Sequence, residues 1–127
     1  MSKELDKEVK ENFPKRGEIW LVKCDKIKEF SKDYRPALVI SNDIQNEFDS
    51  FITTAMMTTD DLENIEPFEV FIENTKETGL KEPSKMSFNR LFSVFKLRLE
   101  KRLGVASREI MEKVKEAWKI SFDVENW

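Results

Sequence analysis

The stretch YRPALVISND, residues 34–43, sets an arginine and a proline in front of a short apolar run and closes with Ser-Asn-Asp. Because Pro36 has no N–H to donate to a neighbouring strand, it belongs at the first position of a strand, and residues 37–40 then form that strand. Residues 41–43 supply turn and helix N-cap chemistry. The stretch therefore predicts a strand that begins beside a cation, Arg35, and ends in a turn.

Similar signals on both sides of this stretch predict a mainly β fold. Aromatic and β-branched residues indicate strands at 18–24, 51–57 and 68–73, with two short strands or one bent strand at 86–88 and 91–97. Ser107 can cap a final helix, whose apolar face is expected to contain Ile110, Met111, Val114, Trp118, Ser121 and Phe122. We therefore expect a small antiparallel barrel with an amphipathic C-terminal helix packed on its flank. Residues 1–14 are expected to form a charged tail or short helix, and residues 15–127 a single domain.

The composition restricts the chemistry that the protein can perform. No histidine occurs among the 127 residues, which removes the commonest general base and metal ligand. Cys24 is the only cysteine, so it cannot form an internal disulfide, and we expect it to be a buried small hydrophobic residue. With three glycines and no phosphate-binding loop motif, neither a cofactor nor a metal site is predicted.

The same reading places the protein in the cytoplasm. The sequence contains no apolar stretch of the length needed to cross a membrane, and its charged start, residues 1–11, lacks the apolar segment of a signal peptide. We therefore expect a cytoplasmic protein that does not associate with a membrane.

Charge is distributed unevenly along the chain, although the formal net charge is only −3. Residues 43–73 contain nine acidic side chains and no Lys or Arg, whereas residues 81–103 contain seven basic side chains and two acidic ones. Such segments are usually solvated faces, but the second leaves room for a local basic groove.

Arg, Thr, Ser and Asn side chains at strand ends remain as candidates for a functional site, because they can hold a phosphodiester through hydrogen bonds and a planar guanidinium. Arg35 stands beside Pro36, which stiffens the backbone, and Thr58 closes the strand expected at 51–57. From local composition alone, Arg35 reads as a surface cation, and β propensity explains Thr58. The residues by themselves leave both interpretations open.

The order of five segments resembles the MazF/PemK family of toxins from bacterial toxin–antitoxin systems. The segments are RGEIWLVKCD, RPALVISNDIQNEF, FITTAMMT, PFEVFIE and EIMEKVKEAWKISF, which together cover about residues 15–123. The resemblance implies an SH3-like barrel of the CcdB/Kid/MazF type that forms a homodimer. It also implies cleavage of single-stranded RNA, often messenger RNA, without a metal or cofactor, and inhibition by a cognate antitoxin protein. The expected products are a 2′,3′-cyclic phosphate and a 5′-hydroxyl.

The resemblance also assigns site residues. Arg35 and Thr58 match the positions most closely tied to cleavage, and Thr59 is the alternative to Thr58. RNA contacts are expected from Lys32, Thr59, Lys85, Asn89 and Arg90, and the possible bases are Glu29 and Asp33. At the position where the family commonly has an arginine after the fifth strand, this chain has Phe92, and Arg90 provides a cation two residues earlier.

A second interpretation is a non-enzymatic protein on the same barrel, either a toxin that poisons DNA gyrase or a divergent binding module without cleavage. The acidic residues 43–73 favour this alternative, because RNA would avoid them. The retention of Arg35 and Thr58 favours the enzyme.

Overall fold

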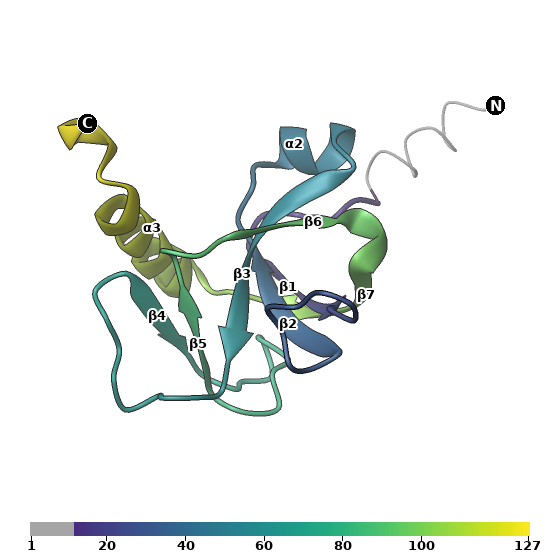
Figure 1. Ribbon diagram of the computed structural model, residues 1–127, viewed down its shortest axis with the longest axis horizontal. Helices are drawn as coiled ribbons and strands as arrows, with labels where there is room; N and C mark the ends of the chain where they lie inside the picture. Colours follow the sequence, from purple (N-terminus) through teal and green to yellow (C-terminus); the bar gives the residue numbers. More distant parts are fainter. Residues whose placement is uncertain (1–11) are drawn as a thin grey trace.

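A computed structural model describes residues 12–127 (Figure 1); residues 1–11, most of the predicted tail, lie outside the described residues. In chain order its elements are β1 (Glu18–Lys23), β2 (Tyr34–Val39), α2 (Asp43–Phe48), β3 (Phe51–Thr58), β4 (Glu69–Ile72), β5 (Ser84–Ser87), β6 (Phe92–Phe95), η1 (Lys96–Arg98), β7 (Leu99–Val105), α3 (Arg108–Phe122) and η2 (Val124–Asn126). The mainly β prediction with a C-terminal helix is confirmed. No helix within residues 12–127 is long and apolar enough to cross a membrane.

The seven strands form one antiparallel sheet, in which six follow the order β4-β5-β3-β2-β1-β7 and β6 pairs with β3 off this path. Strand β3 is shared, because its first half pairs with β6 at residues 51–54 and its last two residues pair with β5. Strands β4 and β7 end the order without pairing to each other within the described chain, so hydrogen bonding does not close the sheet into the expected barrel.

A loop contact joins the two ends of this open sheet. The loop between β4 and β5 crosses β7, where the Val105 N–H donates to the Glu77 carbonyl at 3.0 Å. A Cβ on Gly104 would lie 2.2 Å from the Glu77 carbonyl oxygen, and a Cβ on Gly79 would lie 1.9 Å from that of Leu103. Only residues without a side chain allow the two backbones to approach this closely. We call this contact the glycine seam.

Strands β2 and β3 are buried on both faces. Leu38, Ala55 and Met57 face one core, which α3 covers with Val114 and Ala117. The residues next to them in the strands face a second core, which includes Ala37, Val39, Ile52 and Met56. Because successive strand residues point to opposite faces, the continuous apolar sequence of β2 supplies both cores.

Cys24 belongs to the second core, as expected, and is 1 % exposed. Burial raises the pKa of its thiol above the usual value, so the group stays neutral at physiological pH. Both predicted cap signals are confirmed: the Asn42 side chain accepts from the Gln45 N–H, and the Ser107 hydroxyl from the Ile110 N–H.

The predicted start of the second strand is wrong by two to three residues. Strand β2 begins at Tyr34 and runs through Pro36, because its pairing with β1 continues to Tyr34 opposite Lys23. On the β3 side the paired residues begin only at Ala37, beyond the proline. Arg35 therefore lies inside a strand.

The structure contains one strand that the sequence patterns do not indicate, and it shortens one expected apolar face. Strand β7 was not predicted, because Glu100, Lys101 and Arg102 interrupt its apolar pattern; it is an edge strand, and these charges face solvent. The apolar face of α3 is also shorter than expected, because Trp118 and Phe122 remain 41 % and 38 % exposed. The last turns of α3 extend beyond the sheet (Figure 1), and the Trp118 and Phe122 rings there pack against each other, with their centroids 5.5 Å apart.

The glycine seam predicts a specific sensitivity to added methyl groups. Gly104→Ala is expected to lower the free energy of unfolding by about 3 kcal/mol, because the new Cβ collides with backbone that cannot rotate away. Gly17→Ala has ordinary space, 3.8 Å from the Met111 sulfur, and is expected to cost only the strain of its positive φ, about 1 kcal/mol. Urea unfolding followed by circular dichroism measures both, and equal midpoints for the two variants would contradict the seam.

Candidate active site

The pairing of β2 with β3 brings Arg35 to Thr58. Ala37 lies opposite Met56 in the ladder, and the same register continued by two residues sets Arg35 opposite Thr58. Arg35 Nη1 donates to the Met57 carbonyl at 3.2 Å, and its guanidinium carbon lies 5.3 Å from the centre of the Phe30 ring. The cation is therefore held at the end of β3 by a hydrogen bond and an aromatic face.

Arg35 also carries an unused donor. Its Nε–H is buried and makes no hydrogen bond within residues 12–127. A buried donor without a partner costs about 1–3 kcal/mol and is uncommon in native structures. Its presence on a guanidinium that is otherwise held in place favours a functional role over a structural one.

Thr58 is oriented by the turn that follows it. Its hydroxyl oxygen accepts a hydrogen bond from the Asp60 N–H at 3.1 Å. An acceptor bond of this kind leaves the hydroxyl hydrogen free to be donated elsewhere. The half-buried Thr58 can thus donate to an oxygen bound beside Arg35.

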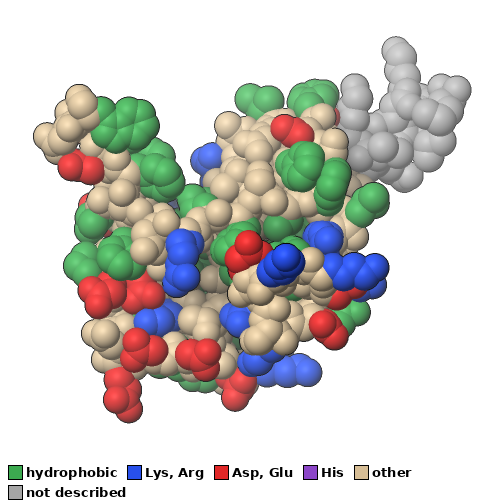
Figure 2. Space-filling view, viewed as in Figure 1, with side chains coloured by type: hydrophobic (Ala, Val, Ile, Leu, Met, Phe, Trp, Pro, Cys, Tyr) green, Lys and Arg blue, Asp and Glu red, His purple; other side chains and the backbone are tan. Residues whose placement is uncertain are grey.

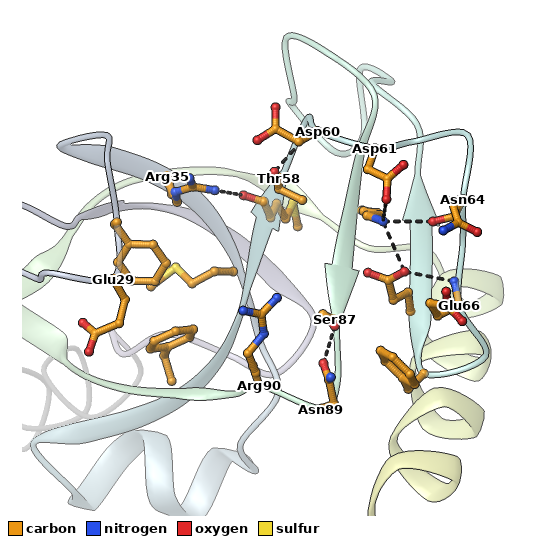
Figure 3. Close-up of a pocket in the computed structure, with 17 residues that line it drawn as sticks. Glu29, Arg35, Thr58, Asp60, Asp61, Asn64, Glu66, Ser87, Asn89 and Arg90 are labelled. Carbon is orange, nitrogen blue, oxygen red and sulfur yellow. Dashed lines mark hydrogen bonds and ion pairs between the residues drawn. The ribbon is translucent and has the colours of Figure 1, made fainter.

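Arg35 and Thr58 lie at one end of a hollow of about 580 Å³ (Figure 3). Five carboxylates line it, and we call it the acidic hollow: Glu29, Asp60, Asp61, Glu66 and Glu69. Aromatic walls come from Phe30, Phe68 and Phe92, and further polar groups from Asn64, Lys85, Ser87, Asn89 and Arg90. A guanidinium and a hydroxyl can bind a phosphate there, while the rings can stack on a base.

Lys85 anchors one side of the acidic hollow. Its ammonium donates to the Asn64 carbonyl at 2.9 Å and to Glu69 at 3.2 Å, and it lies 3.8 Å from Asp61. Glu69 in turn accepts from the Glu66 N–H at 2.9 Å. Lys85 is 6 % exposed, so the loop between β3 and β4 is tied to β5 by a buried cation.

Within residues 12–127, no group of three or more Cys, Asp or Glu side chains is placed to hold a metal ion.

A family model of the PemK-like, MazF-like toxins of type II toxin–antitoxin systems matches residues 15–122. The chain belongs to this family. The match spans every strand and α3, and it includes both Arg35 and Thr58. No curated protein matches the sequence.

Solved structures of similar fold include other toxins. A mycobacterial endoribonuclease is 18 % identical with a TM-score of 0.70, covering 88 % of this chain and 93 % of its own. The Mycobacterium tuberculosis toxin MazF-mt6 is 22 % identical with a TM-score of 0.69, covering 84 % and 96 %. A MazE–MazF structure from Deinococcus radiodurans is 18 % identical with a TM-score of 0.66, covering 87 % and 96 %. At these identities the similarity shows a shared fold.

Most of the site residues that the family resemblance suggested share the acidic hollow. It brings together Glu29, Arg35, Thr58, Lys85, Asn89 and Arg90. Figure 3 shows Arg90 pointing toward Arg35 and Thr58 from the segment after β5, whereas the Glu29 carboxylate lies away from that pair. Lys32 and Thr59 line a second hollow, described below, and Asp33 lines neither of the two.

Phe92 stands at the position where the family commonly has an arginine. It lines the acidic hollow and also packs against the second core. Its ring lies 4.7 Å from that of Phe30. The two rings form part of the wall beneath Arg35, so an aromatic pair occupies this place and the additional cation comes from Arg90.

Sequence reasoning missed two contributions to the site. Phe30 lies in the connection between β1 and β2 and is not among the residues that the sequence suggested for the site. The acidic loop before β4 belongs to the segment that RNA would avoid, yet this loop lines the same hollow as Arg35. The apolar character of Phe30 among charged neighbours was a usable signal. No local signal marks Lys85 as the partner of Glu69, because the two residues are 16 positions apart.

Lys85 is expected to be a stabilising residue. Lys85→Met keeps the aliphatic stem but leaves Glu69 with a buried, unpaired charge, so we expect the free energy of unfolding to fall by about 3–5 kcal/mol. Lys113→Met is the matched control, because its ion pair with Glu109 is exposed and is expected to contribute under about 0.5 kcal/mol. Chemical unfolding of both variants tests this, and similar losses would show that Lys85 is not a buried anchor.

Proposed function

We propose that this toxin is a metal-independent endoribonuclease that cuts single-stranded RNA, messenger RNA included, at short sequence motifs. The observation that carries the proposal is the side-by-side placement of Arg35 and Thr58 at the end of a hollow with aromatic walls. The names of similar structures, an endoribonuclease among them, support it. The products are a 2′,3′-cyclic phosphate and a 5′-hydroxyl.

The proposed reaction begins with attack of a ribose 2′-oxygen on the adjacent phosphorus. The new P–O bond produces a crowded phosphorane with two negative charges, and the bond to the 5′-oxygen then breaks. Arg35 stabilises the charge that develops on the phosphoryl oxygens, and Thr58 donates a hydrogen bond to one of them. Because a guanidinium carries a lasting positive charge in proteins, the role of Arg35 is mainly electrostatic.

A base must remove the proton of the 2′-hydroxyl, and the leaving 5′-oxygen must gain one. Of the two carboxylates considered for the base, Glu29 lines the acidic hollow and Asp33 does not. The Glu29 carboxylate lies away from Arg35 and Thr58, however, so neither residue is assigned as the base. Asn89, Arg90 and Thr59 are proposed to contact RNA around the cleaved bond, whereas the ammonium of Lys85 is already occupied by Asn64 and Glu69.

Two protein partners are proposed, a cognate antitoxin and a second copy of the chain, both in the cytoplasm. Structures of similar fold include an endoribonuclease in complex with its cognate antitoxin. The protein also exposes apolar side chains that suit protein contacts, among them Phe48 at 75 % and Leu97 at 93 %.

A non-enzymatic toxin or binding module remains the second candidate. The acidic hollow favours it, because its five carboxylates outnumber its three cations, Arg35, Lys85 and Arg90, and so repel a polyanion.

Cleavage should depend on Arg35 and persist in EDTA. We expect purified protein to cut a mixed-sequence RNA in EDTA, and Arg35→Ala to lower the rate by at least about 10²–10³-fold. Arg108→Ala, at the exposed start of α3, is the matched control and should cut at the wild-type rate. Mapping the RNA ends measures the products. Absence of any cleavage, together with inhibition of DNA gyrase, would instead identify the second candidate.

The hydroxyl of Thr58 should matter as a donor. Thr58→Val keeps the shape and removes the donor, so we expect a rate loss of about 10²-fold, whereas Thr58→Ser should retain most of the rate. Single-turnover cleavage of a defined RNA gives the comparison. If Thr59→Val is the slower variant and Thr58→Val cuts normally, the catalytic hydroxyl belongs to Thr59.

A further inference from the structure

A second hollow lies on the other side of Arg35 and Thr58. It has a volume of about 300 Å³ and shares Arg35, Met57 and Thr58 with the acidic hollow. Its charged lining includes Lys32, Lys81 and Lys101 against one acidic residue, Glu82, so we call it the basic hollow. The proposed cleavage pair therefore forms a wall between two hollows of opposite charge.

The three lysines of the basic hollow come from different parts of the chain. Lys32 precedes β2, Lys81 lies in the loop between β4 and β5, and Lys101 is on β7. The glycine seam holds that loop against β7, since Gly79 and Leu80 line the same hollow. Convergence of three separate elements distinguishes this arrangement from a charged run on one surface helix.

The ammonium groups in the basic hollow are also free to bind an anion. All three lysines are exposed, and within residues 12–127 none of them forms an ion pair. Lys85 in the acidic hollow differs, because Glu69 and Asp61 already balance its charge. Thr59 and Ser84 add hydroxyl groups to the lining of the basic hollow.

The charge difference restricts how a single strand can cross the wall. When the scissile phosphate lies at Arg35, the RNA strand can continue in two directions. The neighbouring phosphate would meet carboxylates in one direction and lysines in the other. Figure 2 shows the acidic side chains gathered over the lower left, around β4 and the loop before it. Exposed charges that lie closer together than the Debye length, about 8–10 Å at physiological salt, still attract or repel each other. The basic side is therefore favoured for the RNA backbone.

We propose that the basic hollow is a subsite for the backbone of single-stranded RNA, in which Lys32, Lys81 and Lys101 bind the phosphates next to the cleaved bond. This proposal rests on the proposed function. The aromatic walls of the acidic hollow then receive a base, whose amino groups are compatible with surrounding carboxylates. This arrangement explains how the enzyme can bind RNA, a polyanion, although five carboxylates line one side of its site.

The test measures how binding depends on salt. The probe is a fluorescein-labelled 12-nucleotide 2′-O-methyl RNA of mixed sequence, which has the charge of RNA but lacks the nucleophile, and its Kd is measured by anisotropy between about 50 and 200 mM NaCl. Each phosphate contact on a single strand contributes about 0.7 to the slope of log K against log salt. The triple variant Lys32→Gln, Lys81→Gln, Lys101→Gln should therefore reduce the slope by about 2. The matched control, Lys113→Gln, Lys115→Gln, Lys119→Gln on α3, has the same change of charge and should keep the wild-type slope.

Cleavage of unmodified RNA separates failure of this subsite from failure of the proposed function. For the basic-hollow variant we expect KM to rise at least about tenfold while kcat stays within about twofold, because contacts that bind substrate and transition state equally change only KM. An unchanged slope, an equal loss in the α3 control, or no binding of the probe by wild-type protein would overturn the subsite. Absence of RNA cleavage by wild-type protein would overturn the proposed function, whatever the slope.

Discussion

The antiparallel pairing of β2 with β3 is the constraint on which the rest of the structure depends. Its register, with Ala37 opposite Met56, alternates the buried residues of both strands between the two cores. A shift of one residue would move every one of these side chains to the opposite face. The same register, continued past Pro36, sets Arg35 opposite Thr58. The interaction that organises the hydrophobic cores therefore also positions the proposed cleavage pair.

The site is placed where this pairing ends. Beyond Ala37 the two strands no longer form paired residues, and the Met57 carbonyl accepts from the guanidinium of Arg35 instead. The aromatic contact between Phe30 and Phe92 belongs to the second core and forms the floor under the same guanidinium. Because both contacts involve core elements, Arg35 is held in place before any substrate binds, as electrostatic catalysis requires.

Buried contacts at two places hold the acidic and the basic segments on different sides of the site. Lys85 ties the acidic loop to β5, and the glycine seam ties the loop that carries Lys81 to β7. A protein of net charge −3 can in this way present a basic surface next to an acidic one. Net charge affects solubility and long-range attraction, whereas the fold determines which charged side chains a bound RNA strand contacts.

Much of this protein could be predicted from its sequence. The strands at the centre of the sheet have continuous or alternating apolar patterns, and Asn42 and Ser107 are local cap signals that need no tertiary information. The order of motifs around Arg35 and Pro36 was sufficient to suggest the family, which the match over residues 15–122 confirms. Strand β7 could not be predicted, because an edge strand tolerates charges that conceal its period.

The sequence by itself determined the main strands, the helix caps, the family and the candidates Arg35 and Thr58, because each depends on residues close together in the chain or on their order. Only the tertiary structure decided that Arg35 lies inside a strand, that the acidic loop lines its hollow, and that Lys81 and Lys101 converge on its other side. These features depend on strand register and on contacts between segments far apart in sequence. The physical reason is that composition records how many charges a segment carries, whereas pairing and close backbone approach determine which charges meet.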